Sequence, residues 1–159
     1  MTDLKCIIIC CALVFLTACA GPGYFEPIKA VGPNGAVLYL YRPKADNPGM
    51  QPLRLSYPDI IIAGESVGVL KFNEYKTVPI TSGQYRLRVT GLTEKADWAP
   101  KDIDLEFDIK AGETKYIKLD VRFNTEEMSI GQPETRYLIF ATPMDAKSAI
   151  YEIRDTDPE

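Results

Sequence analysis

The sequence predicts an all-β fold: a single β-sandwich or partly open barrel of about seven strands, with one short C-terminal helix. Two observations indicate this class. Short runs of β-branched, aromatic and aliphatic residues recur along the chain, and glycines or prolines separate them at turn-like intervals. Beyond the N-terminal leader, helical periodicity is confined to the C-terminal residues, so no long helices are expected. A length of 159 residues suits one domain of this kind.

The N-terminal residues 1–18 differ from the rest and predict a signal peptide. Lys5 precedes an unbroken apolar run over residues 6–15, which is shorter than the roughly 20 apolar residues of a transmembrane helix. The end of this segment and the next residue resemble the lipobox of bacterial lipoproteins: Leu16, Thr17, Ala18 and Cys19. The resemblance implies cleavage before Cys19 and lipidation of its thiol, which would hold the protein to a membrane.

Lipidation would use the only cysteine of the mature chain. The other three lie in the segment that is removed: Cys6, Cys10 and Cys11. No disulfide is therefore expected. Residues 19–35 combine the lipidated cysteine with prolines, glycines and no sustained periodicity, which predicts a flexible tether. The alternative is a segment that lies along the domain through Tyr24, Phe25 and Ile28.

Residues 36–159 form the predicted β-sandwich domain, which opens with a strand over residues 36–41. Three hairpins are expected after a proline-rich loop, and each pairs two consecutive apolar runs: 60–62 with 67–70, 77–80 with 85–90, and 103–109 with 114–123. Gly83 and Gly112 stand at the second and third turns, where glycine accepts a positive φ. A last strand is expected over 136–141.

A short helix is expected to follow the last strand and to pack on the sheets. Thr142, Pro143 and Asp145 have the composition of a helix start. The next apolar residues recur at helical spacing and predict one buried face: Ala146, Ala149, Ile150 and Ile153.

Residues 60–89 also carry a pattern of turns and strands found in known families. An apolar strand ends at Ala63 and Gly64, and a later strand opens with Gly-Gln-Tyr at residues 83–85. This pattern resembles the core of PEGA-type surface-layer domains. It resembles still more a proteobacterial lipoprotein family of unknown function, which continues with an Ala-Gly-Glu turn, here residues 111–113. The resemblance implies a β-sandwich and implies no known activity.

The residue types exclude most familiar catalytic sites. The chain has no histidine, and its one mature cysteine is assigned to the lipid, so Ser-His, Cys-His and histidine-based zinc sites are all excluded. No Ser-x-x-Lys string, Walker phosphate loop or GxGxxG fingerprint occurs either. We therefore expect a protein that is not an enzyme and that uses no cofactor or metal.

An alternating acidic run invites comparison with a calcium site. It consists of four residues spaced two apart: Asp102, Asp104, Glu106 and Asp108. Apolar residues alternate with these acids, and Phe107 stands where an EF-hand loop needs glycine. The alternation predicts a strand whose acids face water. Lys118 and Arg122 are expected to share this outer face from the neighbouring strand.

Four aromatic residues are the candidates for contact with a partner: Trp98, Tyr57, Tyr75 and Tyr116. Trp98 is the only tryptophan and lies in a predicted loop, where an amphipathic ring could anchor a partner. The alternative is that Trp98 caps one end of the sandwich. The loops over residues 43–58 and 124–134 are further candidate binding edges, or simple connections.

These observations together predict an envelope lipoprotein that acts as a non-enzymatic binding or structural module, accessory to a larger assembly. The net charge of −4 argues against a nucleic-acid partner, and a protein partner in the cell envelope is expected. Ala20 follows the cysteine where the retention signal of Gram-negative lipoproteins has aspartate, so the outer membrane is favoured. The alternatives are a carbohydrate or peptidoglycan binder that uses exposed aromatics and, less favoured, a hydrolase with paired carboxylates.

Overall fold

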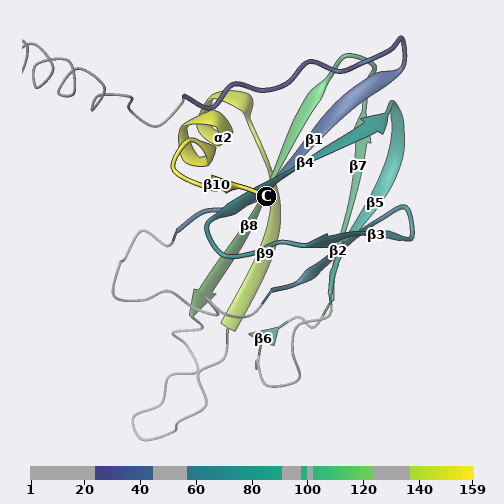
Figure 1. The fold of residues 1–159 in the computed structure, drawn as a ribbon. Helices are drawn as coiled ribbons and strands as arrows, with labels where there is room; N and C mark the ends of the chain where they lie inside the picture. Colours follow the sequence, from purple (N-terminus) through teal and green to yellow (C-terminus); the bar gives the residue numbers. More distant parts are fainter. Residues whose placement is uncertain (1–23, 45–56, 91–97, 100–101, 124–136) are drawn as a thin grey trace, which may run out of the picture.

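The computed structural model describes residues 24–44, 57–90, 98–99, 102–123 and 137–159. These residues form a β-sandwich of two sheets with one short helix, which confirms the predicted fold class (Figure 1). The predicted signal peptide, the lipobox and Cys19 lie outside the described residues. No helix in the described ranges is long and apolar enough to cross a membrane.

The larger sheet has six strands in the order β10-β4-β1-β8-β9-β6. Their bounds are Asp157–Pro158 for β10, Glu74–Thr81 for β4, Gly35–Arg42 for β1, Thr114–Phe123 for β8, Tyr137–Met144 for β9 and Trp98–Ala99 for β6. The central strand β1 runs antiparallel to β4 and parallel to β8. Strand β9 then pairs antiparallel with β8.

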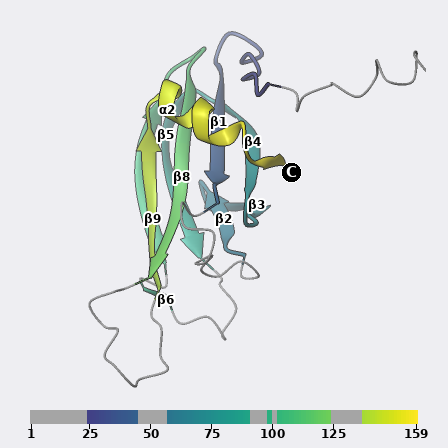
Figure 2. The ribbon, with the colours of Figure 1, turned by 90° about the vertical axis from the view of Figure 1, so that its left-hand side faces the viewer.

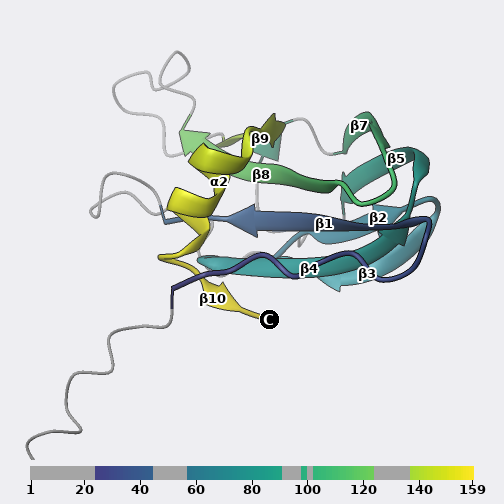
Figure 3. The same ribbon diagram turned by 90° about the horizontal axis from the view of Figure 1, so that it is seen from above.

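The smaller sheet has four strands in the order β3-β2-β5-β7. Their bounds are Glu65–Val69 for β3, Asp59–Ile62 for β2, Gly83–Thr90 for β5 and Ile103–Ile109 for β7. All of its pairings are antiparallel. The two sheets stack face to face, as the views in Figures 2 and 3 show.

Only the first of the three predicted hairpins is a hydrogen-bonded pair of strands, β2 with β3. The other two predictions were wrong, because β4 and β5 belong to different sheets, as do β7 and β8. Ser82 alone separates β4 from β5, and its N–H donates to the Asn34 carbonyl at 2.7 Å. Gly83 begins β5 as a strand residue, whereas Gly112 has the expected positive φ of 75°. Apolar alternation identifies the buried face of a strand but not the strand with which it pairs. Two consecutive strands bury the same faces whether they pair as a hairpin in one sheet or lie in two stacked sheets.

The space between the sheets is filled by the inward-facing aliphatic side chains. The six-stranded sheet contributes buried residues from β1, β8 and β9: Ala36, Leu38, Leu40, Ile117, Leu119 and Ile139. The four-stranded sheet contributes buried residues from β2, β5 and β7: Ile60, Ile62, Leu87, Val89, Phe107 and Ile109. This is the main core of the domain.

A second cluster covers the outer face of the six-stranded sheet. It joins aromatic residues of β1 and β8 to the N-terminal segment and to the helix α2 (Ala146–Ile153): Phe25, Val37, Tyr39, Tyr41, Tyr116, Ala149 and Ile153. Figure 3 shows α2 lying across β8 and β1, with the N-terminal segment along β4. Because both faces of β1 are covered, nearly every residue of that strand is buried.

The N-terminal segment from residue 24 onward is part of the folded domain. The Phe25 ring makes edge contacts with Tyr39 and Tyr75, each with centroids 5.2 Å apart. The Ile28 N–H donates to the Tyr39 hydroxyl at 2.8 Å. The tether predicted over 19–35 is therefore corrected for residues 24–35, since burial of an aromatic ring favours the attached conformation. Residues 19–23 lie outside the described part.

Helix α2 begins one residue after Asp145, whose side chain accepts from the Ser148 N–H at 3.0 Å. This N-cap confirms the predicted start at Asp145, whereas Thr142 and Pro143 lie in β9, opposite Lys118 and Ile117. Proline is tolerated in a strand position that need not donate a hydrogen bond. Ala149 and Ile153 are buried and Ile150 is half-buried, whereas Ala146 is exposed.

A polar contact holds α2 to the sheet beneath it. The hydroxyl of Tyr41, a fully buried residue, donates to Glu152 Oε2 at 3.0 Å. Lys118 Nζ lies 3.1 Å from Glu152 Oε1 and 3.0 Å from Oε2. Burial, together with the nearby Glu152 carboxylate, raises the pKa of Tyr41 well above its ordinary value of about 10.

Tyr41→Phe is expected to change how stability depends on pH. Because the folded-state pKa of Tyr41 is raised, its contribution is present below about pH 10 and is lost as the pH rises further and the unfolded chain ionises. The variant should lose about 1 kcal/mol at neutral pH, from the missing hydrogen bond, and should lose stability less steeply above pH 10. Urea unfolding at a series of alkaline pH values measures the unfolding free energy of both proteins. The prediction is contradicted if this free energy falls equally steeply with pH in the wild type and in the variant.

Candidate functional site

The outer face of the four-stranded sheet carries no helix in the described structure, in contrast to that of the six-stranded sheet. Polar and charged side chains of β5, of β7 and of the residue before β7 point outward there. We call this set the charged face: Gln84, Arg86, Arg88, Asp102, Asp104, Glu106 and Asp108. The charged face therefore contains two guanidinium groups and four carboxylates. A regular sheet holds these side chains in fixed register, as a recognition surface requires.

The register of β5 and β7 places opposite charges side by side. Arg86 is opposite Glu106, and Arg88 is opposite Asp104. Asp104 accepts from both guanidinium groups: its Oδ2 lies 2.8 Å from Arg86 Nη2 and its Oδ1 lies 2.8 Å from Arg88 Nε. One carboxylate thus fixes the orientation of two arginines.

The electrostatics of the charged face follow from this shared carboxylate. Hydrogen bonds from Arg88 and Arg86 hold the pKa of Asp104 far below its usual range. The same hydrogen bonds raise the pKa of Arg86 and that of Arg88. All three groups therefore stay charged through the physiological pH range and do not exchange protons near neutrality. The Asp108 side chain makes no hydrogen bond or ion pair with any residue that the structure describes.

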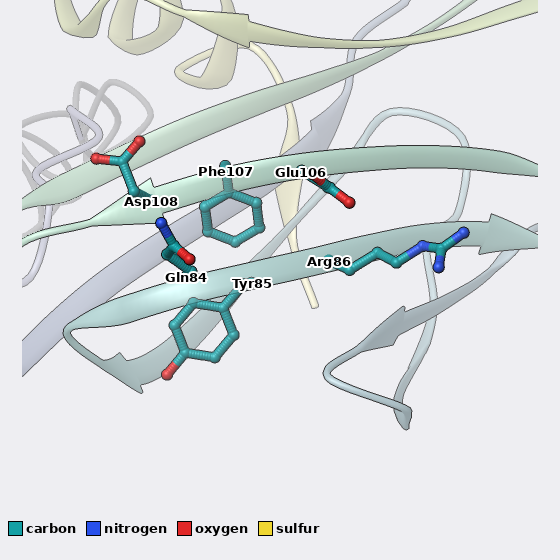
Figure 4. Close-up of a pocket in the computed structure, with 6 residues that line it drawn as sticks. All are labelled: Gln84, Tyr85, Arg86, Glu106, Phe107 and Asp108. Carbon is teal, nitrogen blue, oxygen red and sulfur yellow. The ribbon is translucent and has the colours of Figure 1, made fainter.

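A shallow depression of about 380 Å³ lies within the charged face (Figure 4). Its lining comes equally from β5 and β7: Gln84, Tyr85, Arg86, Glu106, Phe107 and Asp108. The rings of Tyr85 and Phe107 stack on each other with centroids 5.7 Å apart. The Tyr85 hydroxyl donates to the Thr81 carbonyl at 2.9 Å. The depression thus offers amide, guanidinium and carboxylate groups to a ligand, while its aromatic rings are engaged with each other.

The acidic run has the orientation that its alternation predicted. Its four acids are exposed, while Phe107 and Ile109 are buried. The prediction that Lys118 and Arg122 share this face with the acids was wrong, because β8 lies in the other sheet. Lys118 pairs there with Glu152, and Arg122 pairs with Asp120.

The structure separates the aromatic residues that sequence reasoning grouped as partner contacts. Tyr116 is only 2% exposed and stacks on Tyr39 with centroids 5.4 Å apart, so its ring is not available to a partner. Tyr75 is half-buried against Phe25, and Tyr57 is half-buried. Trp98 lies in β6 and pairs in parallel register with Tyr137 of β9, but its side chain is outside the described part.

The arginines of the charged face were missed by sequence reasoning, although a signal for them exists. Arg86 and Arg88 alternate with Leu87 and Val89 in the same way as the acids alternate on β7. Two amphipathic strands with complementary charges are expected to pair when no turn prescribes another partner. A buried arginine was also missed: Arg42 is 2% exposed, lies 5.8 Å from the Phe72 ring centroid, and has its pKa lowered to about 10 by burial.

In the described ranges, no group of three or more Asp, Glu, Cys or His side chains converges as metal ligands would. The fold and its charged face define a β-sandwich domain in which α2 and the N-terminal segment cover the outer face of one sheet, while no described element covers the outer face of the other. Comparisons of the chain with protein-family models, with curated proteins and with solved structures found no match. The functional argument therefore depends on the residues and their geometry.

Proposed function

We propose that this protein is a lipid-anchored, non-enzymatic binding module of the bacterial cell envelope, favoured in the outer membrane, that binds a protein partner through its charged face. The family of proteobacterial lipoproteins that it resembles is part of this proposal. The observation that carries it is the contrast between the two sheets. One has its outer face covered by α2 and the N-terminal segment, while the other presents fixed, charged side chains to solvent.

The anchor is supported by the sequence around Cys19. A short apolar leader ends in Leu16, Thr17 and Ala18, and the cysteine follows directly. The described domain begins at Tyr24, only five residues beyond Cys19, so a lipid on that cysteine would hold the domain close to the membrane. Several acyl chains give far more stable binding than one, because each buried methylene contributes about 0.8 kcal/mol.

The charged face supports binding to a partner rich in basic residues. Four carboxylates stand against two guanidinium groups, and both guanidinium groups are already bound to Asp104. Surplus negative charge therefore remains at Glu106 and Asp108, beside the depression. Charge complementarity of this kind accelerates association and selects partners more than it adds affinity. Binding is then expected to weaken as salt is raised.

A non-enzymatic role agrees with the chemistry of this surface. Asp104, Arg86 and Arg88 keep their charges near neutral pH, so none of them is suited to proton transfer there. The Tyr85 hydroxyl is bound to Thr81. The carbohydrate alternative needs aromatic faces open to a sugar, whereas Tyr116 is buried and Tyr75 is half-buried.

The proposal is tested by placing a photo-crosslinking amino acid at Gln84 in the full chain and irradiating intact cells. We expect a discrete crosslinked partner. Reversing two charges with Glu106→Lys and Asp108→Lys should reduce the crosslink about tenfold, because the acid-rich face would repel a basic partner. The matched control is Glu26→Lys with Asp155→Lys, which changes the charge equally at exposed acids outside the charged face.

The anchor is read out in the same cells. Mass spectrometry of the wild-type N-terminus should show acyl groups on Cys19, and Cys19→Ser should release the chain from the membrane fraction and remove the crosslink. A wild-type chain with an unmodified Cys19 would refute the lipid anchor. Crosslinks that survive the charge reversal unchanged would refute the charged face as the binding surface.

A further inference from the structure

Most of the large apolar side chains that the described structure exposes lie on one side of the molecule. Tyr24, Ile28 and Val31 belong to the N-terminal segment, and Tyr151 belongs to α2; they are 71%, 50%, 90% and 61% exposed, respectively. Tyr24 and Tyr151 line one groove of about 710 Å³, and Ile28 and Val31 line a second of about 450 Å³. We call these four residues the apolar side. The first groove brings two of these exposed rings together beside α2, and exposed apolar side chains gathered in this way mark an interaction surface.

The neighbouring groups have the chemistry of a membrane interface. The Arg154 guanidinium lies 3.9 Å from the centroid of the Tyr151 ring, and Lys147 lines the same groove as Tyr24. Tyrosine rings favour the headgroup level of a bilayer, where the ring body is apolar and the hydroxyl is hydrated. Lysine and arginine can bury their aliphatic stems there and keep their charges in water.

The length of chain before Tyr24 fixes where this side must be. Tyr24 is the fifth residue after Cys19, and a fully extended chain spans at most about 3.6 Å per residue, so the two Cα atoms lie within about 18 Å. If Cys19 carries lipid, its backbone is at the membrane surface. Tyr24, the first residue of the apolar side, is therefore held within about 18 Å of the membrane surface.

We infer that the apolar side lies on the bilayer surface, with the rings of Tyr24 and Tyr151 among the lipid headgroups. This inference rests on the proposed lipid anchor. The balance of charge permits this orientation. The N-terminal segment and the surroundings of α2 carry exposed bases, Lys29, Lys147 and Arg154, beside exposed acids, Glu26, Asp145 and Asp155, whereas the charged face has four acids against two arginines and would be repelled by anionic lipid. The domain is thus held with α2 toward the membrane and the charged face directed away from it, toward a partner.

The test uses the purified lipidated full chain in vesicles of phosphatidylethanolamine and phosphatidylglycerol. Once Cys19 is lipidated, the mature chain has no other cysteine. A nitroxide can therefore be attached at Ser148→Cys on the groove of Tyr24 and Tyr151, or at Gln84→Cys on the charged face. We expect collisions with a water-soluble nickel complex to be several-fold rarer at the Ser148 label than at the Gln84 label.

Substitution of the two tyrosines provides the specific control. Tyr24→Ser with Tyr151→Ser should abolish the protection at the Ser148 label while the lipid keeps the chain on the vesicles. Val69→Ser changes an exposed apolar residue of the other sheet and should leave the protection intact. Both tyrosines are mostly exposed, so the fold should tolerate these changes.

The remaining outcomes separate this inference from the anchor itself. Equal exposure of the two labels on a vesicle-bound chain, with acylated Cys19 in its mass spectrum, would overturn the docking and leave the anchor standing. A chain with unmodified Cys19 would overturn both. Protection that rises with protein density at constant lipid composition would show that a second copy covers the apolar side, which also overturns docking on lipid.

Discussion

A chain that begins at residue 36 should be less stable than one that begins at residue 24 by about 3 to 5 kcal/mol, the usual cost of losing a buried phenylalanine. The sequence alone predicts that residues 36–159 fold independently. In the structure, however, Phe25 is 8% exposed and packs edge-on against Tyr39 and Tyr75. Removing residues 24–35 would expose these two rings on the outer face of the six-stranded sheet.

The shortened chain also loses hydrogen bonds at the ends of strands. The Asn34 carbonyl accepts from the Ser82 N–H, between β4 and β5, and the Gly35 carbonyl accepts from the Gly112 N–H at 2.7 Å, between β7 and β8. Both connections cross from one sheet to the other. Asn34 and Gly35, at the start of β1, therefore stabilise the two places where the chain changes sheets, which no hairpin holds together.

Urea unfolding of the two chains, followed by far-ultraviolet circular dichroism, measures the difference. In the longer chain, Phe25→Ala should cause most of the loss, whereas Tyr24→Ala, at a residue that is 71% exposed, should change the unfolding free energy by no more than about 0.5 kcal/mol. Equal stabilities of the chains that begin at 24 and 36 would show that the N-terminal segment contributes nothing to the fold.

The strands and their buried faces were predictable because alternation is a local property. The acids at 104, 106 and 108 alternate with Leu105, Phe107 and Ile109, and this alternation defines both faces of β7 without any knowledge of its neighbours. The C-terminal helix was predictable for the same reason, from its apolar spacing and from Asp145 at its start.

The partners of the strands were not predictable from these patterns. The residues between β7 and β8 include Gly112 with a positive φ, which suits a hairpin turn and a crossing between stacked sheets equally well. Choosing between them depends on contacts distant in sequence, such as the parallel pairing of β1 with β8. The candidate site could be predicted only in part for the same reason. The acids were recognised from the sequence, but Arg86 and Arg88 lie beside them only because β5 pairs with β7.

The last prediction concerns Lys76, a lysine that points into the sandwich. Val78 and Ile80 of the same strand pack against the main core, so Lys76, at the same parity, shares their inward orientation, and it is 4% exposed. Its Nζ is paired with Glu159, which follows β10 and donates its own N–H to the Tyr75 carbonyl at 3.1 Å. A buried cation on β4 is thus paired with the residue that follows β10, the edge strand of the six-stranded sheet.

Glu159→Ala is expected to reduce the unfolding free energy by roughly 3 kcal/mol. Removing one partner of a buried ion pair costs about 3 to 5 kcal/mol, because the remaining charge stays in a poorly solvated position. The lower end applies here, since the Glu159 side chain is 44% exposed and water can partly replace it. Asp155→Ala, in an exposed pair with Arg154, is the matched control and should change stability by less than about 1 kcal/mol.

Adding Lys76→Met to Glu159→Ala should restore stability to within about 1 kcal/mol of the wild type or exceed it, because an apolar side chain of similar length fills the same space without a charge to compensate. Urea unfolding of the wild type, of Glu159→Ala, of Lys76→Met and of the double variant completes a double-mutant cycle. We expect it to give a coupling free energy of about 2 kcal/mol between the two residues. If Glu159→Ala costs the same with methionine at position 76 as with lysine, the two residues are not coupled. The loss would then come from the pairing of β10 with β4 rather than from the buried charge.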